Sequence, residues 1–315
     1  MTGGVRRLIA LCLMLALVLK GADRCRAGDT SAVWNGAAYP LDAKAIDLGD
    51  ARVDDWDAFA AFLDRFPQLE RVDMFAAPVT GRRADALKKA FPRVTFGWTL
   101  RITCYDGHEH RVRTDAEVFS TLHSNKSAWH TDEELGVLRY CTGLKALDIG
   151  HNRVTDLSFL YDMPELRVLI IAINQVRDLT PVASLRHLEY LEMFRNRVRD
   201  LSPLQGLEHL MDLNICYNIV TDVTPLHGMT QLKRLWLAQS AYYTSGKQKG
   251  LPRDALRALR SSLPDTVIDS ASSPTSGGWR EGAHYRVIAE MFRTGTYIPF
   301  EDSAQPREFR FAPAE

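Results

Sequence analysis

The sequence is poor in cysteine, which excludes a fold held together by disulfides. Only five cysteines occur among 315 residues, and two of them, Cys12 and Cys25, fall within the first 27. The other three form an odd and sparse set, which is not a disulfide framework. We interpret Cys141 and Cys216 as small buried thiols, and nothing in the sequence selects one pairing among the three. The chain is long enough to bury a sizeable hydrophobic core instead.

Long apolar runs are also missing. The longest, Leu8 to Leu19, has twelve residues, whereas a helix needs about 20 to cross a bilayer. Two arginines precede this run and Lys20 ends it, a pattern that predicts a secretory signal peptide over residues 1–27. A lipoprotein signal at Cys25 and an uncleaved anchor are the alternatives. We therefore expect a secreted or cell-surface protein with no transmembrane anchor.

Neither sign of charge dominates the chain. Lysine plus arginine and aspartate plus glutamate each count 39. Without residues 1–27 the chain has 34 basic and 38 acidic residues, a net charge of −4. Domains that bind nucleic acid present a basic face, so nucleic acid is not an expected partner. We also find no Gly-rich phosphate loop, H-E-x-x-H or G-x-S-x-G, and we expect neither enzyme activity nor a cofactor.

The chain does contain a 22-residue sequence repeat that occurs four times in succession. The copies begin at Leu144, Leu166, Leu188 and Leu210, and a further start opens at Leu232. Each copy has aliphatic residues at its first, fourth and sixth positions and asparagine at its ninth. A fixed period with the pattern L-x-x-L-x-L-x-x-N-x-[VI] is typical of leucine-rich repeats. One such unit cannot bury its own faces, and stacking builds a continuous core.

The pattern predicts a short parallel strand in each repeat, followed by a turn at the asparagine. The asparagine amide would satisfy turn backbone groups, each of which would cost roughly 1–3 kcal/mol if buried unpaired. Only eleven residues remain for the return, so we expect turns or 3₁₀ pieces on the convex side. A column of aspartates should cap backbone donors at that turn, with calcium binding as the alternative. Its members are Asp156, Asp178, Asp200 and Asp222.

Longer, helix-bearing repeats flank this array. Two strand-like lines, Ala43–Val53 and Leu69–Val79, are each followed by a helical stretch. An alternating segment with Asp106-Gly107 at its centre predicts a β-hairpin insertion, and Thr131 with Glu134 makes a capping box for the next helix. The predicted organisation is a signal peptide over 1–27, irregular repeats over 28–93, hairpin and helix over 94–143, leucine-rich repeats over 144–241, a helix-bearing repeat over 242–269, and a linker with a capping tail over 270–315.

The tail from Trp279 to Phe300 is rich in aromatic residues at helical spacing. A terminal repeat leaves an open sheet edge and an exposed core end, and we expect the tail to cover them. In the alternative, the tail or the hairpin covers the concave face of the sheet.

The inner repeats are similar to the 22-residue repeats of the internalins, strongly over Leu144–Ala241 and more weakly over Ala43–Val94. The chain thus resembles a secreted bacterial leucine-rich repeat protein. The resemblance implies an α/β solenoid, with a curved parallel sheet and a convex side of turns, 3₁₀ pieces and some helices. A β-hairpin insertion and a C-terminal cap complete the expected fold. The resemblance also implies a concave face that holds another protein.

Outward-pointing positions on the concave face mix aromatic, aliphatic and charged residues. A merely solvated face would be polar throughout, and aromatic residues beside arginine are typical of binding hot spots. We therefore predict a protein ligand on this face of a monomeric chain, with glycan or cell-envelope polymer binding as the alternative. The predicted ligand-binding residues are Ile170, Ile173, Tyr190, Glu192, Phe194, Arg195, Asp212, Tyr217, Arg234 and Trp236.

Two other groups of residues are weaker candidates for chemistry. His108 and His110 flank one residue and could hold a metal with His123 or His130, but an H-x-H of this kind is more often part of a polar loop. Cys104 with a histidine base would make a nucleophile pair, yet no orienting acid is indicated by the spacing. We therefore predict no metal site and no catalytic residue, and keep a hydrolase at this hairpin as a third hypothesis.

Overall fold

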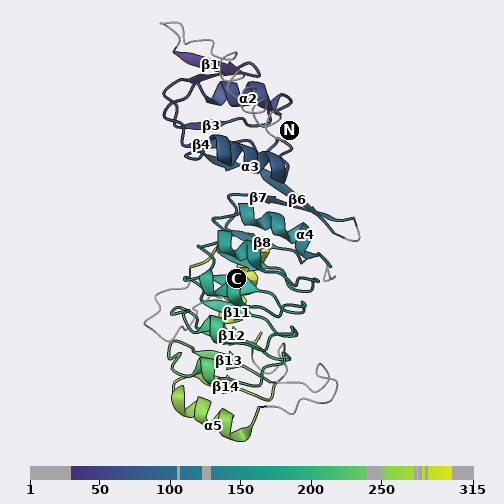
Figure 1. The fold of residues 1–315 in the computed structure, drawn as a ribbon, viewed down its shortest axis with the longest axis vertical. Coiled ribbons are helices and arrows are strands. Elements are labelled where there is room, and N and C mark those ends of the chain that lie inside the picture. Colours follow the sequence, from purple (N-terminus) through teal and green to yellow (C-terminus); the bar gives the residue numbers. More distant parts are fainter. Residues whose placement is uncertain are drawn as a thin grey trace, which may run out of the picture. The chain divides into compact units, whose positions relative to one another are not determined.

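Figure 1 shows the fold of the computed structural model, which describes residues 30–104, 107–122, 129–238, 251–272, 275, 279–280 and 283–299. The predicted signal peptide, Asp106 of the hairpin turn and His123 lie outside the described residues. The chain divides into two compact units, residues 1–99 and residues 100–315, and each is described by itself. In the described part of the chain, no helix has both the length and the apolar character needed to cross a bilayer.

The first unit contains the irregular repeats. Parallel strands β3 (Ala45–Asp47), β4 (Arg71–Asp73) and β5 (Thr95–Gly97) form a three-stranded sheet. Helices α2 (Trp56–Leu63) and α3 (Gly81–Ala90) follow β3 and β4, and the side chains of Asp55 and Thr80 cap their first turns. An antiparallel pair that the sequence did not predict, β1 (Ser31–Trp34) and β2 (Ala37–Pro40), precedes this sheet. Its turn residues Asn35 and Gly36 both have positive φ, as a two-residue hairpin turn requires.

The second unit is built on a seven-stranded parallel sheet, in the order β14-β13-β12-β11-β10-β9-β8. The irregular and the regular repeats therefore form separate sheets. The 22-residue repeats supply β9 (Ala146–Asp148), β10 (Val168–Ile170), β11 (Tyr190–Glu192), β12 (Asp212–Asn214) and β13 (Arg234–Trp236). Neighbouring strands pair with a register of 22, so Leu147 lies opposite Leu169 and Leu169 opposite Leu191. Each repeat position therefore forms a straight column across the sheet.

The leucine columns make the core of this unit. The five residues that open the repeats are fully buried, and so are the aliphatic residues at the fourth and sixth positions. Truncating one such leucine to alanine typically costs 2–5 kcal/mol, because a cavity adds to the lost transfer free energy. The five opening leucines are Leu144, Leu166, Leu188, Leu210 and Leu232.

The asparagines form a buried ladder that ties each turn to its neighbours. Asn196 donates from Nδ2 to the carbonyl of Ile171 (2.8 Å) and to that of Met193 (3.1 Å), and its Oδ1 accepts from the amide of Val176 (3.0 Å). Asn174 and Asn218 repeat this pattern one repeat earlier and one later. The predicted role of the asparagine amide is therefore confirmed by its hydrogen bonds.

The convex side consists of short 3₁₀ segments, as predicted for so short a return path. They span Ser158–Asp162, Thr180–Ser184, Ser202–Leu204 and Thr224–Leu226. Before each segment an aspartate accepts a hydrogen bond from the amide two residues later, at 2.8 Å in all four repeats. The aspartate column thus serves the turns, as expected.

Helices and a hairpin flank the regular repeats. β6 (Thr99–Thr103) and β7 (Glu109–Arg113) form the expected two-stranded hairpin, and helix α4 (Asp132–Leu135) has the expected capping box. Between them lies β8 (Val118–Ser120), which pairs with β9 in the repeat register and adds a strand that the sequence did not predict. At the other end, α5 (Arg253–Ser262) leads to β14 (Val267–Asp269), which pairs with β13.

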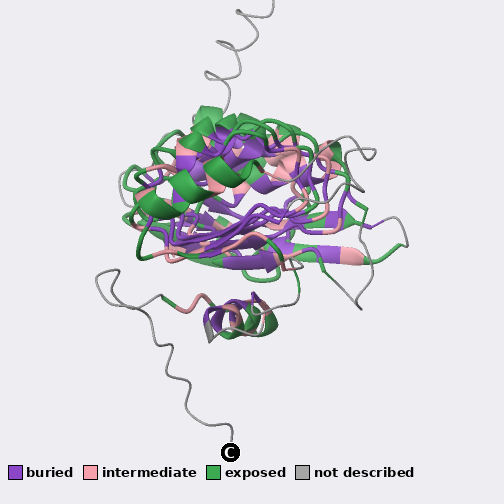
Figure 2. Ribbon diagram, turned by 90° about the horizontal axis from the view of Figure 1, so that it is seen from below, coloured by how far each residue is buried: buried purple, intermediate pink, exposed green. Residues whose placement is uncertain are grey.

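The C-terminal helix α6 (Ala283–Thr294) lies against the sheet, on the side opposite to the convex segments (Figure 2). It packs near β8 and β9. The tail therefore covers the concave face, which was the alternative to covering the end of the array.

Candidate functional site

The C-terminal tail buries most of the concave-face residues that were predicted to bind a ligand. Tyr190 and Glu192 are 0% exposed, and Phe194 is 1% exposed. Ile170, Asp212 and Trp236 are buried as well. Since a closed face offers no contact area, these six residues can meet a ligand only if the tail leaves.

Trp279 is the centre of this cover. Its indole Nε1 donates to the hydroxyl of Tyr190 and to Oε2 of Glu192, both at 3.0 Å. The Tyr190 hydroxyl itself donates to the same Glu192 oxygen at 2.6 Å. The Trp279 ring lies 5.6 Å from the ring of Tyr190 and 5.4 Å from that of Trp236, between centroids. A buried indole with a satisfied N–H combines large apolar area with a directional bond.

Arg280 completes the pairing of Glu192. Its guanidinium NH2 lies 2.5 Å from Oε1 of Glu192. The buried carboxylate thus accepts from an indole, a phenol and a guanidinium. Charge-assisted hydrogen bonds of this kind are about twice as strong as neutral ones. Burial and the adjacent Glu192 together raise the pKa of Tyr190 well above its usual range.

Helix α6 presents its apolar side to the sheet. Val287, Ile288 and Met291 are buried in the same cluster as Ala146 and Val168, while Arg286 and Arg293 on the other side are exposed. The aromatic residues and the helical spacing of this segment predicted a covering tail. No pattern in the sequence identified Trp279 or Arg280 as the residues that anchor the tail to the sheet.

Two titratable groups at the contact between the tail and the sheet have pKa shifts of opposite sign. Burial raises the pKa of Asp148 on β9 to about 7, against a hydrogen bond from the Gly150 amide. Burial lowers the pKa of His284 on α6 to about 4, although the Asp212 carboxylate opposes this. Both groups are therefore held closer to neutrality than they would be in water.

Asp212 and Arg234 bind each other across β12 and β13. Arg234 Nε lies 2.6 Å from Oδ1 of Asp212, and its NH2 donates to Oδ2 at 2.9 Å. This two-point pair occupies both predicted ligand-binding residues within the sheet.

Apart from the half-buried Arg234, three of the predicted residues remain accessible, at the eighth position of their repeats. Arg195 is exposed, and Ile173 and Tyr217 are half-buried. Together with His151 they form a column in which every residue has positive φ, between 55° and 61°. Their amides donate to carbonyls of the next repeat, as in the 2.8 Å bond from Ile173 to Phe194.

His151, Ile173 and Arg195 of this column line a hollow of about 530 Å³ at the carboxyl ends of the strands, which we call the strand-end hollow. Among the residues that the structure describes, its lining holds three exposed arginines and no carboxylate. Arg153 lies over the exposed ring of Trp129, with its guanidinium carbon 4.2 Å from the centroid. The lining residues are Trp129, His151, Asn152, Arg153, Ile173, Asn174, Gln175, Arg195, Asn196, Arg197 and Ile219. Arg153, Arg197 and Ile219 stand at the tenth position of their repeats, beyond the strand positions from which the ligand-binding residues were predicted, and were therefore missed.

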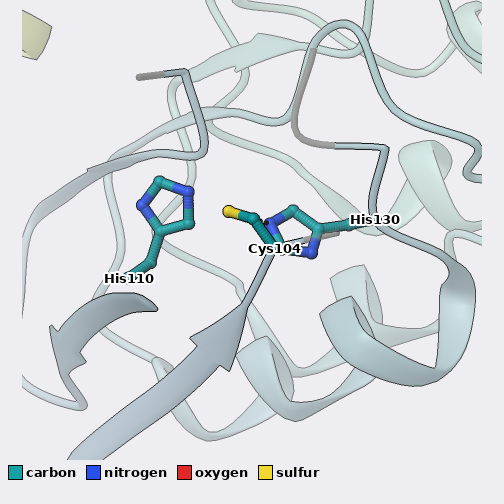
Figure 3. A group of neighbouring side chains, drawn as sticks. All are labelled: Cys104, His110 and His130. Carbon is teal, nitrogen blue, oxygen red and sulfur yellow. Dashed lines mark hydrogen bonds between the residues drawn. The ribbon is translucent and has the colours of Figure 1, made fainter. Parts of the chain in front are cut away.

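Cys104, Cys141 and Cys216 are buried, and none of them forms a disulfide with another described residue. Burial raises the pKa of Cys141 and of Cys216 to about 12, so both thiols are protonated and inert at neutral pH. Cys104 lies beside His110 and His130 (Figure 3). His108 is exposed, but His110 is 8% exposed, so its interpretation as part of a polar loop is wrong.

A scan against protein-family models gives no match, and a search of curated proteins gives none. Among solved structures, the chain is similar to internalin C2 from Listeria monocytogenes, with 23% identity, a TM-score of 0.38 and coverage of 64% of this chain and 86% of that one. A second internalin of that organism shows 15% identity, a TM-score of 0.39 and coverage of 75% and 84%. A leucine-rich repeat protein from Leptospira interrogans shows 14% identity, a TM-score of 0.36 and coverage of 66% and 74%.

The fold is that of a leucine-rich repeat solenoid. This conclusion rests on the chain's own 22-residue register, its asparagine ladder and its seven-stranded parallel sheet.

Proposed function

We propose that this solenoid is an extracellular interaction module that binds an acidic segment of a protein ligand in the strand-end hollow. The observation that carries the proposal is the charge of the lining, where Arg153 and Arg197 are exposed and where none of the described lining residues carries a carboxylate. Arginine and tryptophan are enriched at binding hot spots because they combine apolar area with directional bonding. A ligand with clustered carboxylates would be complementary in charge to Arg153 and Arg197.

The backbone of the eighth-position column supports a contact role. A positive φ costs a residue other than glycine roughly 1–2 kcal/mol, and more for a β-branched one such as Ile173. Glycine would adopt this conformation without that cost, yet the four repeats carry His151, Ile173, Arg195 and Tyr217 there. Residues held in a strained backbone conformation are a reason to infer function at those positions.

Because the tail closes the concave face, it argues against protein binding and against glycan binding on that face. Protein binding there would first require the tail to leave. Sugar stacking needs open ring faces, whereas Tyr190, Phe194 and Trp236 are buried and Tyr217 is half-buried. We therefore propose that the ligand binds in the strand-end hollow and that it is a protein and not a glycan. Export rests on the basic and apolar pattern of residues 1–27.

The test compares two charge reversals of equal size. Arg153→Glu with Arg197→Glu reverses two charges of the hollow, and Arg177→Glu with Arg199→Glu reverses two exposed arginines of the same repeat array that lie outside its lining. Binding of a fluorescent oligoglutamate peptide and retention of proteins from surface extracts are measured for both variants and the parent chain. We expect the first variant to lose at least about tenfold in affinity, which is about 1.4 kcal/mol, and the control to stay within about twofold.

Equal losses in both variants would show that net charge alone attracts acidic ligands. No loss in the first variant would exclude the hollow as the binding site.

A further inference from the structure

The residue His130 stands where the regular repeats place valine. Its amide donates to Oδ1 of Asn152 at 2.8 Å, as the amide of Val154 does to Asn174 at 3.0 Å. Its carbonyl accepts from the amide of Arg153 at 2.9 Å, as that of Val154 does from Gln175. Val154, Val176 and Val198 in this column are all 0% exposed, and His130 is 1% exposed. An imidazole thus replaces an aliphatic core residue at the first turn of the array.

Such a replacement is costly unless the imidazole has a polar role, because buried polar groups must be satisfied. The hairpin supplies its neighbours. Cys104 follows β6, His110 lies in β7, and His130 precedes α4 (Figure 3). The Cys104 sulfur is 3.4 Å from Nε2 of His130, and one ligand atom from each of the three residues lies within 4.8 Å of the others. Cys104 is 4% exposed.

The distances suit a tetrahedral ion. With Zn–S near 2.3 Å and Zn–N near 2.0–2.1 Å, sulfur and nitrogen ligands lie roughly 3.6 Å apart. The Cys104–His130 distance is close to this value, and the widest separation needs to shorten by roughly 1 Å. Thiolate and imidazole are the donors that zinc prefers.

A carboxylate stands behind one of the imidazoles. Glu134 Oε2 lies 3.8 Å from Nδ1 of His130, on the ring nitrogen that does not face Cys104. The same oxygen accepts from the amide of Thr131 at 2.7 Å and from its hydroxyl at 3.0 Å. A fixed carboxylate beside the far nitrogen of a histidine is the usual support of a metal-bound imidazole.

We propose that Cys104, His110 and His130 bind a zinc ion. The ion joins two ligands of the hairpin to one of the loop before α4, and so fastens the hairpin to the first turn of the solenoid. Binding removes the proton from the Cys104 thiol and requires both imidazoles to be neutral at the coordinating nitrogens. Three protein ligands leave the fourth tetrahedral position to solvent or another ligand.

The experiment uses the full chain, stripped of metal and titrated with zinc and with cobalt(II). Bound metal is counted by mass spectrometry, and a cobalt–thiolate charge-transfer band reports coordination by sulfur. We expect one ion per chain, a higher Tm with zinc, and slower alkylation of Cys104 when zinc is present. Cys104→Ser should lose the charge-transfer band, while Cys216→Ser, which changes a buried thiol of a regular repeat, should keep both the band and the stoichiometry.

A further variant, Glu134→Gln, keeps all three ligands and is expected to weaken zinc binding about 10–100-fold. This variant protects the test if Cys104→Ser fails to fold. The proposal is overturned if the folded parent chain takes up neither metal. It is equally overturned if zinc leaves the alkylation rate of Cys104 unchanged, as a bare Cys–His nucleophile would behave, or if Cys216→Ser loses metal to the same extent as Cys104→Ser.

Discussion

At the scale of single residues, the contacts of Glu192 show that the concave face is covered by the tail and not solvated. On a solvated sheet this fifth-position carboxylate would point into water. Here it is 0% exposed and accepts from Tyr190, Trp279 and Arg280. Breaking a buried pair of this kind costs more than its net contribution, since one charge is left uncompensated. The tail is therefore held by specific polar contacts as well as by apolar area.

Asp148 under the tail and His284 on α6 make the docking of the tail sensitive to pH in opposite senses. The pKa of His284 is lowered to about 4 from 6.5, so its contribution is present above pH 6.5 and is lost as the pH falls toward 4. The pKa of Asp148 is raised to about 7 from 3.8, so its contribution is greatest below pH 3.8 and is lost as the pH rises toward 7. Between pH 4 and 6.5 the two effects oppose each other.

We predict that single substitutions separate these effects. In Asp148→Asn, His284 is the only one of the two groups that still titrates. Acidification from pH 6.5 to 4 should then weaken docking of the tail by up to about tenfold per pH unit. In His284→Asn, Asp148 is the only one of the two groups that still titrates, and the same acidification should strengthen docking of the tail. Hydrogen exchange of the α6 amides, corrected for its intrinsic pH dependence, gives the slopes. The same slope in the parent and both variants would show that neither group senses the tail.

Residue-level predictions succeeded where a repeat fixes the environment. The ladder role of Asn196 and the turn role of Asp200 follow from their place in a 22-residue period, because the same backbone surrounds that place in every repeat. The buried state of His110 could not be read in this way. The ring of His110 packs against that of His130, 5.6 Å away between centroids, and the local H-x-H pattern does not indicate a neighbour 20 residues later.

At the scale of elements, the strands β9 to β13 could be predicted with their register, since the period defines both. β8 was missed because the segment Val118–Ser120 lacks the leucine pattern, although it pairs with β9 as a repeat strand does. The tail was predicted to cover the end of the array, with the concave face as the alternative, and it lies on the concave face. Which apolar strip a helix covers is decided by contacts between residues almost 90 positions apart, such as Trp279 with Tyr190, and no local pattern contains them.

Trp279 should be the element-scale determinant of docking. Trp279→Ala removes a fully buried indole and two hydrogen bonds, and we expect docking to weaken by about 3–5 kcal/mol. Faster proteolysis in the linker before Trp279 and greater binding of a hydrophobic dye would report the opened face. The matched control is Trp129→Ala, whose ring is 49% exposed, and it should change neither signal. Equal effects of both substitutions would refute this anchor role.

At the scale of the whole repeat unit, the tail changes how stability is distributed. In a bare solenoid each repeat contacts only its neighbours, so the ends can open independently. Here the tail contacts β11 through Glu192, reaches β13 through the ring of Trp236, and packs α6 near β8 and β9. Lys145, just before β9, also lies over the ring of Tyr297, 5.4 Å from its centroid. Strands far apart in the sheet are thereby coupled through one segment.

Removing the tail should therefore reduce cooperativity as well as stability. A chain ending at Ser272 is expected to unfold with a lower denaturant midpoint and a smaller m-value, because part of the array opens before the rest. Hydrogen exchange should then differ between β8–β9 and β13–β14, where the parent chain protects both alike. A chain ending at Phe300 keeps the cover and serves as the control. If the shorter chain kept the parent's m-value and uniform protection, the leucine core and the asparagine ladder alone would account for the cooperativity of the array.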